Sequence, residues 1–577
     1  MRRRLRKHAR EVNWPGKSSC QRRRVLPSLL AMSGKPTANP SRRAEILIQR
    51  AAWAVLALTI LVVVIARVRL RAMPLERDEG EYAYAGQLML EGVPPYKLAY
   101  NMKLPGTYAA YAVMMGVFGQ SPAGIHLGLT VVNVATIVLM FFLGRRLLDA
   151  VTGAVAALGY GLLSTSPSLM GTAGHATHFV ALFAVGGAWL LLRASETERR
   201  RDFFLTGLLF GLAFLMKQPG LAFGVFAVAY VAWRNFANKE FQLERCLTQT
   251  GLVFAGLALP YALTCVWLWH AGVLKAFIFW TVGYARQYVS ALPWSLLRTS
   301  LHVAGEFTLL PTVAFWILAG VGAVLMWWER RLAGRHFFLL GLVFASIAAT
   351  AAGLYFRPHY FITMLPALTL LCGVAVSRSV DQLLREKSVE LFSALGVQVL
   401  FFVVIVVAFV EDGDDWFGRE PRKVGQAIYG TTLFSESQTV ADYIRQNFPK
   451  DARVAVIGSE PQIYFLAGRR SATGYIYTYG LMGKHQFARP MQDEMIREIE
   501  SARPECVVYV ENRYSWAKSP GTDERIFDWW KDYWAAHYDL ARTVTVTDGN
   551  PKENDALPEA AASYFLILKR KSDDRSK

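Results

Sequence analysis

Long apolar stretches dominate this chain and decide what it can fold into. A membrane-spanning helix needs about 20 mostly apolar residues, and the sequence supplies such stretches repeatedly, separated by polar segments. Hydrophobic residues make up 53% of the 577 positions and charged residues only 19%, too few to cover soluble domains of this length. We therefore predict a polytopic α-helical membrane protein with about 11 to 13 spans. The apolar pattern favours 47–68, 122–144, 150–168, 178–193, 203–216, 221–233, 247–269, 308–328, 336–356, 361–377 and 390–410.

Positive charge predicts how the chain is oriented. Clusters of Lys and Arg mark the cytoplasmic ends of spans, and residues 1–43 hold thirteen of these residues against one acid, Glu11. Such an arm could bind nucleic acid, but beside a span it is better interpreted as a cytoplasmic segment attracted to anionic lipids. We expect a disordered cytoplasmic arm over 1–46, no nucleic-acid partner, and a multi-pass protein of the bacterial inner membrane. Met32 is a second candidate start.

Two features interrupt the regular series of spans within the membrane domain, 47–410. Residues 107–119 are apolar but short, so we predict a re-entrant or juxtamembrane helix inside the first external loop, 69–121. Pro219 and Gly220 separate two short spans and indicate helices that break near the outer face. A further external loop is expected around Trp280 and Tyr284.

Residues 411–577 return to a soluble composition. Short β-like runs alternate with helix-like stretches, which indicates a small α/β domain. The orientation of the spans predicts that this tail is periplasmic. The expected strands lie at 453–458, 505–510 and 563–569, and the expected helices at 437–448 and 490–500.

Ionisable residues gather at the predicted outer face, where such groups are costly and usually functional. Asp78 or Glu79 could act as a general base, although acids at a helix start are also favoured by its dipole alone. Lys103 and Lys217 could each hold a phosphate or simply extend their ammonium groups to the membrane surface. The group comprises Asp78, Glu79, Glu81, Lys103, His175, His178, Lys217, Arg357 and His359.

The histidines are candidate metal ligands. His175 and His178 are three residues apart, a spacing that could place both on one helical face. No third ligand is evident, so we predict no metal site here. His359 beside Tyr360 is interpreted as part of an interfacial aromatic belt.

At these residues the chain resembles family 39/83 glycosyltransferases of the GT-C superfamily, which include polyprenyl-phosphate-sugar mannosyltransferases and aminoarabinose transferases. The resemblance covers most of 47–480 in order, with the tail segment VADYIRQNFPKDARVAVIGSEPQIYFLAGRR similar to the outer domain common in such proteins. The membrane segments that carry it are RDEGEYAYAGQLMLEGVPPY, NMKLPGTYAAYAVMMGVFGQSP, GLLFGLAFLMKQPG and RPHYFITMLPAL.

The resemblance implies a GT-C fold with catalytic acid Asp78, Glu79 beside it, and Lys103 and Lys217 at the donor phosphate. It also implies substrate-binding roles for Glu81, Tyr82, His175, His178, Arg357, His359 and Tyr360. Two departures concern the sugar and the acceptor. Lys103 is followed by Leu-Pro-Gly where many members have Lys-Pro-Pro, and Glu81-Tyr82-Ala83-Tyr84 stands where aminoarabinose transferases have Arg-Tyr-Ala-Glu.

The implied activity is an inverting transfer, on the periplasmic side, from a polyprenyl-phosphate-linked sugar to an unidentified acceptor, which could be an envelope glycan, a lipid or a protein. The other expected partners are the surrounding membrane lipids. No cofactor is required for such a transfer, although a divalent cation could assist. The alternatives are a non-catalytic flippase for lipid-linked sugars and a scaffold that assembles an envelope complex through its tail.

Overall fold

The computed structural model describes residues 40–290, 294–384, 388–430, 432–518, 520–547, 550–558 and 563–572. The predicted arm therefore lies almost wholly outside the described residues. By its contacts the chain divides into Met1–Leu47 and Ile48–Lys577, so the later helices and the tail form one unit. The helical elements up to the tail are α1 (Pro40–Arg69), η1 (Leu70–Ala72), α2 (Arg77–Leu90), α3 (Pro105–Phe118), α4 (Pro122–Leu147), α5 (Ala150–Leu163), η2 (Pro167–Leu169), α6 (Ala176–Thr197), α7 (Arg200–Met216), η3 (Gln218–Gly220), α8 (Leu221–Phe236), α9 (Leu243–His270), α10 (Leu274–Ile278), η4 (Phe279–Tyr284), α11 (Ala285–Ser290), α12 (Trp294–Ala304), η5 (Gly305–Leu309), α13 (Val313–Leu325), η6 (Met326–Trp328), η7 (Arg330–Leu332), α14 (His336–Ala351), η8 (Pro358–Thr363), α15 (Leu365–Leu384) and α16 (Ser388–Phe417).

Each of the eleven predicted spans has a helix in the structure, so the polytopic architecture is confirmed. Among the described residues, six helices are long and apolar enough to cross a membrane, judged by length and composition. A seventh span results if the pair Leu297–Leu309 and Val313–Trp328, bent by 95°, is counted as one. The six are Arg43–Ala72, Pro122–Leu147, Ala176–Thr197, Leu243–His270, Leu365–Leu384 and Leu391–Phe417.

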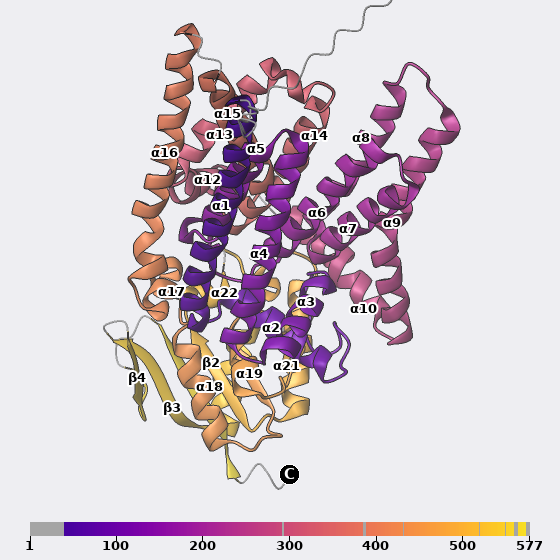
Figure 1. The fold of residues 1–577 in the computed structure, drawn as a ribbon. Helices are drawn as coiled ribbons and strands as arrows, with labels where there is room; N and C mark the ends of the chain where they lie inside the picture. Colours follow the sequence, from indigo (N-terminus) through magenta and orange to yellow (C-terminus); the bar gives the residue numbers. More distant parts are fainter. Residues whose placement is uncertain are drawn as a thin grey trace, which may run out of the picture. The chain divides into compact units, whose positions relative to one another are not determined.

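Small residues let the central helices approach closely, as is usual where lipid removes the hydrophobic drive for association. A side chain at Gly207 of α7 would collide with the backbone of Val253 on α9, and one at Gly256 of α9 would collide with Phe204. In the same region α6 packs on α7 and α4 packs on α5. Figure 1 shows α6, α7, α8 and α9 in one region of the molecule. This close packing fixes the loop ends that carry the polar residues.

Several breaks in the helices match the sequence and others do not. The chain breaks at η3 between α7 and α8, as Pro219 and Gly220 predict. The short apolar stretch forms α3, whose depth in a membrane stays a prediction. The segment expected to be a loop around Trp280 is instead helical, formed by α10, the π-helix η4 and α11. The predicted end of the membrane domain at 410 falls inside α16.

The tail carries the only sheet among the described residues, and the predicted α/β character is confirmed. Its five strands have the order β1-β2-β5-β3-β4, with β1 and β2 parallel and the other pairs antiparallel. Helix α18 packs on β3 and β4, and Figure 1 shows it lying across the strands. The β3–β4 hairpin was not predicted. The elements are α17 (Pro421–Tyr429), α18 (Glu436–Asn447), β1 (Val454–Ile457), α19 (Gln462–Ala467), α20 (Tyr479–Met482), α21 (Ala488–Ala502), β2 (Cys506–Glu511), α22 (Arg513–Trp516), α23 (Arg525–His537), β3 (Tyr538–Thr547), β4 (Asn550–Asn554) and β5 (Tyr564–Arg570).

Candidate active site

Helix α2 holds Asp78 in its first turn. Glu76 and Glu79 cap the helix reciprocally: the Glu79 amide donates to Glu76 Oε1 at 2.8 Å, and the Glu76 amide donates to Glu79 Oε2 at 3.3 Å. This capping box satisfies two amide groups that the helix itself leaves unpaired. It fixes where α2 begins and therefore where the Asp78 carboxylate lies.

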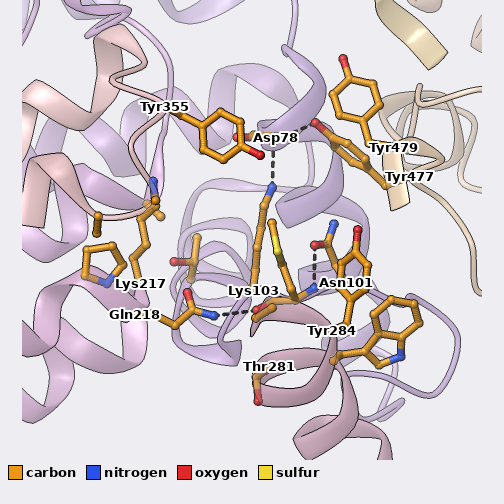
Figure 2. Close-up of a pocket in the computed structure, with 18 of the residues that line it drawn as sticks. Asp78, Asn101, Lys103, Lys217, Gln218, Thr281, Tyr284, Tyr355, Tyr477 and Tyr479 are labelled. Carbon is orange, nitrogen blue, oxygen red and sulfur yellow. Dashed lines mark hydrogen bonds and ion pairs between the residues drawn. The ribbon is translucent and has the colours of Figure 1, made fainter. Parts of the chain in front are cut away.

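Lys103 joins two carboxylates of α2. Its Nζ lies 2.8 Å from Asp78 Oδ1 and 2.7 Å from Glu81 Oε2, and the Tyr108 hydroxyl donates to Glu81 Oε1 at 2.6 Å. Burial favours the neutral form of Asp78, but the Lys103 ammonium outweighs it and holds the pKa of Asp78 well below its usual range. Asp78 is therefore a fixed negative charge in this arrangement. Figure 2 shows Lys103 reaching across to it.

A cavity of about 710 Å³ opens beside this pair. It is large enough for a drug-sized or sugar-phosphate group, and its walls come from both the membrane helices and the tail. The predicted site residues that line it are Asp78, Tyr82, Lys103, Lys217, Arg357, His359 and Tyr360. These residues come from distant parts of the chain, and the structure brings them to one cavity; their roles stay predictions.

Lys217 lies across the cavity from the tail, at the point where α7 ends (Figure 2). Its Nζ is 3.8 Å from the centre of the Tyr360 ring, and no ion pair to a described residue is found for it. Burial lowers the pKa of Lys217 to about 7. The neighbouring Gln218 side chain donates to the Met102 carbonyl at 2.7 Å, which connects this corner to the Lys103 segment. A cation with little local compensation is suited to receive an anion.

Other predicted residues lie behind the cavity wall. Glu79 is fully buried, where it accepts from the Gly174 amide at 2.5 Å and lies 3.1 Å from His126 Nε2. These contacts position α2, and the catalytic role of Glu79 stays a prediction. His178 lies inside the bundle, with Nδ1 3.3 Å from the Asn133 amide nitrogen. Glu81 and His175 contact or approach the lining residues without lining the cavity themselves.

The tail supplies a wall that the sequence analysis did not assign to the site. Tyr475, Tyr477 and Tyr479 all line the cavity, and the Tyr477 hydroxyl is 3.4 Å from Asp78 Oδ1. Beside them, Trp280 and Tyr284 of η4 add two more aromatic rings, with the centre of the Trp280 ring 6.0 Å from that of Tyr475. The signal available in the sequence was a tyrosine at every second position of the run YIYTY, a pattern that places alternate side chains on one side of an extended segment.

Buried polar contacts tie this tail to α2. Arg77 Nη2 lies 2.7 Å from Glu460 Oε1, and Arg77 Nε donates to the Ser459 carbonyl at 2.5 Å. The Tyr84 hydroxyl accepts from the Ser471 amide at 2.8 Å. The helix that carries Asp78 is thus held between the membrane helices and the tail.

Comparisons with known proteins identify the fold of this chain. Residues 103–269 match the family model described as dolichyl-phosphate-mannose-protein mannosyltransferase. The apo structure of ArnT from Cupriavidus metallidurans aligns with a TM-score of 0.54 at 15% identity, over 90% of this chain and 98% of that one. The chain has the GT-C fold. The fold that the resemblance implied is therefore confirmed.

Two further GT-C structures extend the comparison. ArnT from C. metallidurans bound to undecaprenyl phosphate aligns with a TM-score of 0.52 at 15% identity, over 89% of this chain and 98% of that one. The oligosaccharyltransferase AglB from Archaeoglobus fulgidus, in complex with an inhibitory peptide and a dolichol-phosphate, aligns with a TM-score of 0.50 at 12% identity, over 90% and 76% of the two chains. No curated protein sequence matches the chain significantly.

Proposed function

We propose that this GT-C protein is a membrane glycosyltransferase that moves a sugar from a polyprenyl-phosphate-linked donor to an acceptor hydroxyl. The observation that carries the proposal is the Asp78–Lys103 pair, which faces one cavity together with Lys217. The family-model match and the ArnT structure bound to undecaprenyl phosphate support the same donor class. We propose further that the reaction occurs on the periplasmic side of a bacterial inner membrane.

Lys217 and Arg357 are the proposed ligands of the donor phosphate. Both line the cavity, and Ala349 and Ala352 line it on the same side. A phosphate held here would keep the ammonium of Lys217 charged, because a nearby anion favours the protonated form. The apolar alanines leave a lipid-compatible path for the polyprenyl chain. Charge that develops on the leaving phosphate is stabilised by fixed cations, so no general acid is needed.

Asp78 is the proposed base. The acceptor oxygen attacks the anomeric carbon, the bond from that carbon to the phosphate oxygen breaks, and the acceptor proton passes to the Asp78 carboxylate. Because the pKa of Asp78 is well below its usual range, it is a weak base and accepts the proton only once the new bond has made the hydroxyl acidic. Attack from the face opposite the phosphate inverts the sugar.

The aromatic wall is the proposed acceptor side. Tyr477 and Tyr479 lie on the opposite side of Lys103 from Lys217 (Figure 2). Aromatic rings with polar edges can cover the apolar face of a bound group and still offer hydrogen bonds. This layout separates the two substrates, as an in-line displacement requires.

A test compares Asp78→Asn with Glu91→Gln, which removes an exposed carboxylate that pairs with Arg470 at the far end of α2. Loss of a base typically costs roughly 10²- to 10⁴-fold in turnover. Asp78→Asn should therefore let the lipid-linked sugar accumulate in a complemented deletion strain, measured by mass spectrometry, while the purified protein still binds polyprenyl phosphate. Glu91→Gln should behave as the unmodified protein.

The same experiment separates the alternatives. A flippase or a scaffold does not need the carboxylate as a base, so its phenotype would survive Asp78→Asn. Normal consumption of the lipid-linked sugar by a double Asp78→Asn, Glu79→Gln variant would refute the proposed mechanism.

A further inference from the structure

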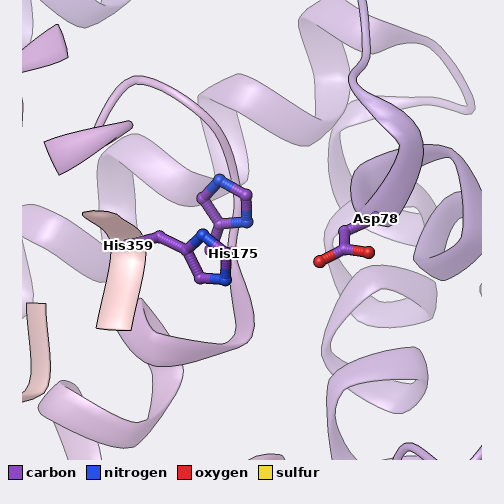
Figure 3. A group of neighbouring side chains, drawn as sticks. All are labelled: Asp78, His175 and His359. Atoms are coloured by element: carbon purple, nitrogen blue, oxygen red, sulfur yellow. The ribbon is translucent and has the colours of Figure 1, made fainter. Parts of the chain in front are cut away.

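Three potential metal ligands meet at the edge of the cavity, and they come from three separate segments. Asp78 lies in the first turn of α2, His175 precedes the first residue of α6, and His359 lies in η8. One ligand atom from each lies within 4.8 Å of the other two. Figure 3 shows the Asp78 carboxylate facing the two imidazole rings, which are stacked on each other.

Three imidazole nitrogens of this group are buried without a hydrogen-bond partner among the described residues. His175 and His359 are only 2% and 5% exposed. Neither nitrogen of His175, nor Nδ1 of His359, makes a hydrogen bond to a described residue. Leaving a buried polar group unsatisfied costs roughly 1–3 kcal/mol. By contrast, His126 nearby is bonded through both nitrogens, at 2.9 Å to the Arg71 carbonyl and 3.1 Å to Glu79.

The two imidazole rings are stacked face to face, so one of them must tilt for both to bind the same ion. Their centres are 4.0 Å apart and their planes differ by 10°. With these nitrogens unbonded, each ring can offer a lone pair to a metal ion, as neutral histidine does.

We propose that Asp78, His175 and His359 bind one divalent transition-metal ion, of which Zn²⁺ and Mn²⁺ are the chemically fitting examples. Two imidazoles with one carboxylate suit such ions better than Mg²⁺ or Ca²⁺, which prefer oxygen ligands. Ligand atoms about 2.0–2.2 Å from an ion in tetrahedral geometry are roughly 3.4 Å apart. The side chains would need to close by about 1.4 Å at most from the 4.8 Å limit, a shift within reach of side-chain rotation.

The surrounding charges allow a cation here. Asp78 Oδ1 is paired with Lys103, which leaves its second oxygen for the ion. Glu76 Oε1 lies 3.7 Å from His175 Nδ1 and adds a further carboxyl oxygen on the same side. Lys217 and Arg357 oppose the ion from the cavity side, where the donor phosphate proposed above would offset their charge.

Three protein ligands leave coordination positions open, the arrangement typical of catalytic rather than structural sites. His359 and Asp78 both line the cavity, so an open position would face the bound donor. If the protein is the transferase proposed above, the ion would neutralise charge on the leaving phosphate. That role rests on the proposed function, whereas metal binding itself does not.

The test uses the full-length protein, purified with an affinity tag that contains no histidine and stripped with a chelator. Inductively coupled plasma mass spectrometry after reloading with Zn²⁺ or Mn²⁺ gives the stoichiometry, and visible absorption of bound Co²⁺ reports its ligands. We expect one ion per chain, and a Co²⁺ Kd raised at least tenfold by His175→Gln or His359→Gln. The control is His302→Gln, since His302 is exposed on α12 and pairs with Glu306 at 3.4 Å, away from the three proposed ligands.

Folding is checked by gel filtration and by retained binding of polyprenyl phosphate. An ion should also raise the melting temperature of the unmodified protein, and not that of a His175→Gln, His359→Gln double variant. Co²⁺ binding by the double variant equal to that of His302→Gln would overturn the site. Undiminished turnover of lipid-linked sugar by metal-free protein would overturn the catalytic role of the ion, while leaving the transferase proposal intact. Metal binding without any sugar transfer in cells would support the site and count against the transferase.

Discussion

Gly80 is the point at which α2 meets the tail, and replacing it with alanine should disturb the site without touching a reacting group. A Cβ built on Gly80 would lie 2.6 Å from the backbone nitrogen of Gln462, 2.7 Å from its Cβ and 2.8 Å from its Cα. Backbone atoms cannot move aside as a flexible side chain can. Helix α2 and helix α19 of the tail must therefore separate.

The size of the effect follows from these distances. Restoring an ordinary contact of 3.4 Å requires a separation of about 0.8 Å. Asp78 is two residues from Gly80, so it shifts by a similar amount relative to Tyr477 on the tail. A misplacement of roughly 1 Å costs about 10²-fold in turnover. Overpacking costs about 1–3 kcal/mol of stability, which exceeds the gain of about 0.5–1 kcal/mol expected for glycine to alanine in a helix.

The assay measures lipid-linked sugar in complemented cells and polyprenyl phosphate binding by the purified protein. Gly80→Ala should lower turnover by about 100-fold and leave the binding of polyprenyl phosphate nearly unchanged, because Lys217 lies across the cavity from the tail. The control is Gly251→Ala in α9, where a Cβ would meet no atom within 4 Å. Turnover by folded Gly80→Ala within threefold of that control would show that docking of the tail does not position Asp78.

Three further changes test other parts of the site. The pKa of Lys217 is about 7, so its ammonium group loses its proton above that pH. The affinity for polyprenyl phosphate should therefore fall by up to about tenfold per pH unit above pH 7. Lys217→Arg should abolish this slope in a titration from pH 7 to 9. Arg77→Met leaves Glu460 buried without its partner and should cost about 3–5 kcal/mol, seen as faster proteolysis of the tail and partly reversed by adding Glu460→Gln. Tyr477→Phe removes the hydroxyl near Asp78 and should lower turnover by roughly 2- to 12-fold, with donor binding unchanged; no loss would remove that hydroxyl from the mechanism.

The membrane part of the fold was predictable because a bilayer imposes a strong and local rule. Apolar length determined the span positions, and proline and glycine marked the break at η3. The same rule does not reach the segment from α10 to α12, where aromatic and polar residues alternate without span-length apolar runs. Its helices depend on packing against other parts of the chain, such as the stacking of Trp280 on Tyr100 at 5.7 Å.

The candidate site was predictable only in part, for a similar reason. Asp78, Lys103 and Lys217 could be proposed because charges at a membrane boundary are unusual in any context. That Lys103 pairs with both Asp78 and Glu81 depends on the approach of helix α2 and the loop before α3, which no local pattern encodes. His359 was interpreted as an interfacial residue, yet it is buried against His175, far away in the sequence.

The tail changes how the site should be understood, because it is part of the cavity wall rather than an appended domain. Its contacts with α2 are the kind that tolerate little movement: a buried ion pair at Arg77 and a glycine that touches backbone. Breaking a buried pair is costly because the remaining charge is left without a partner, so the docked position of the tail is strongly favoured. The tail also contributes Tyr477 within 3.4 Å of Asp78. The choice of acceptor should therefore depend on tail residues as much as on the membrane helices, and exchanging residues 475–479 alone should change acceptor preference while leaving the donor class unchanged.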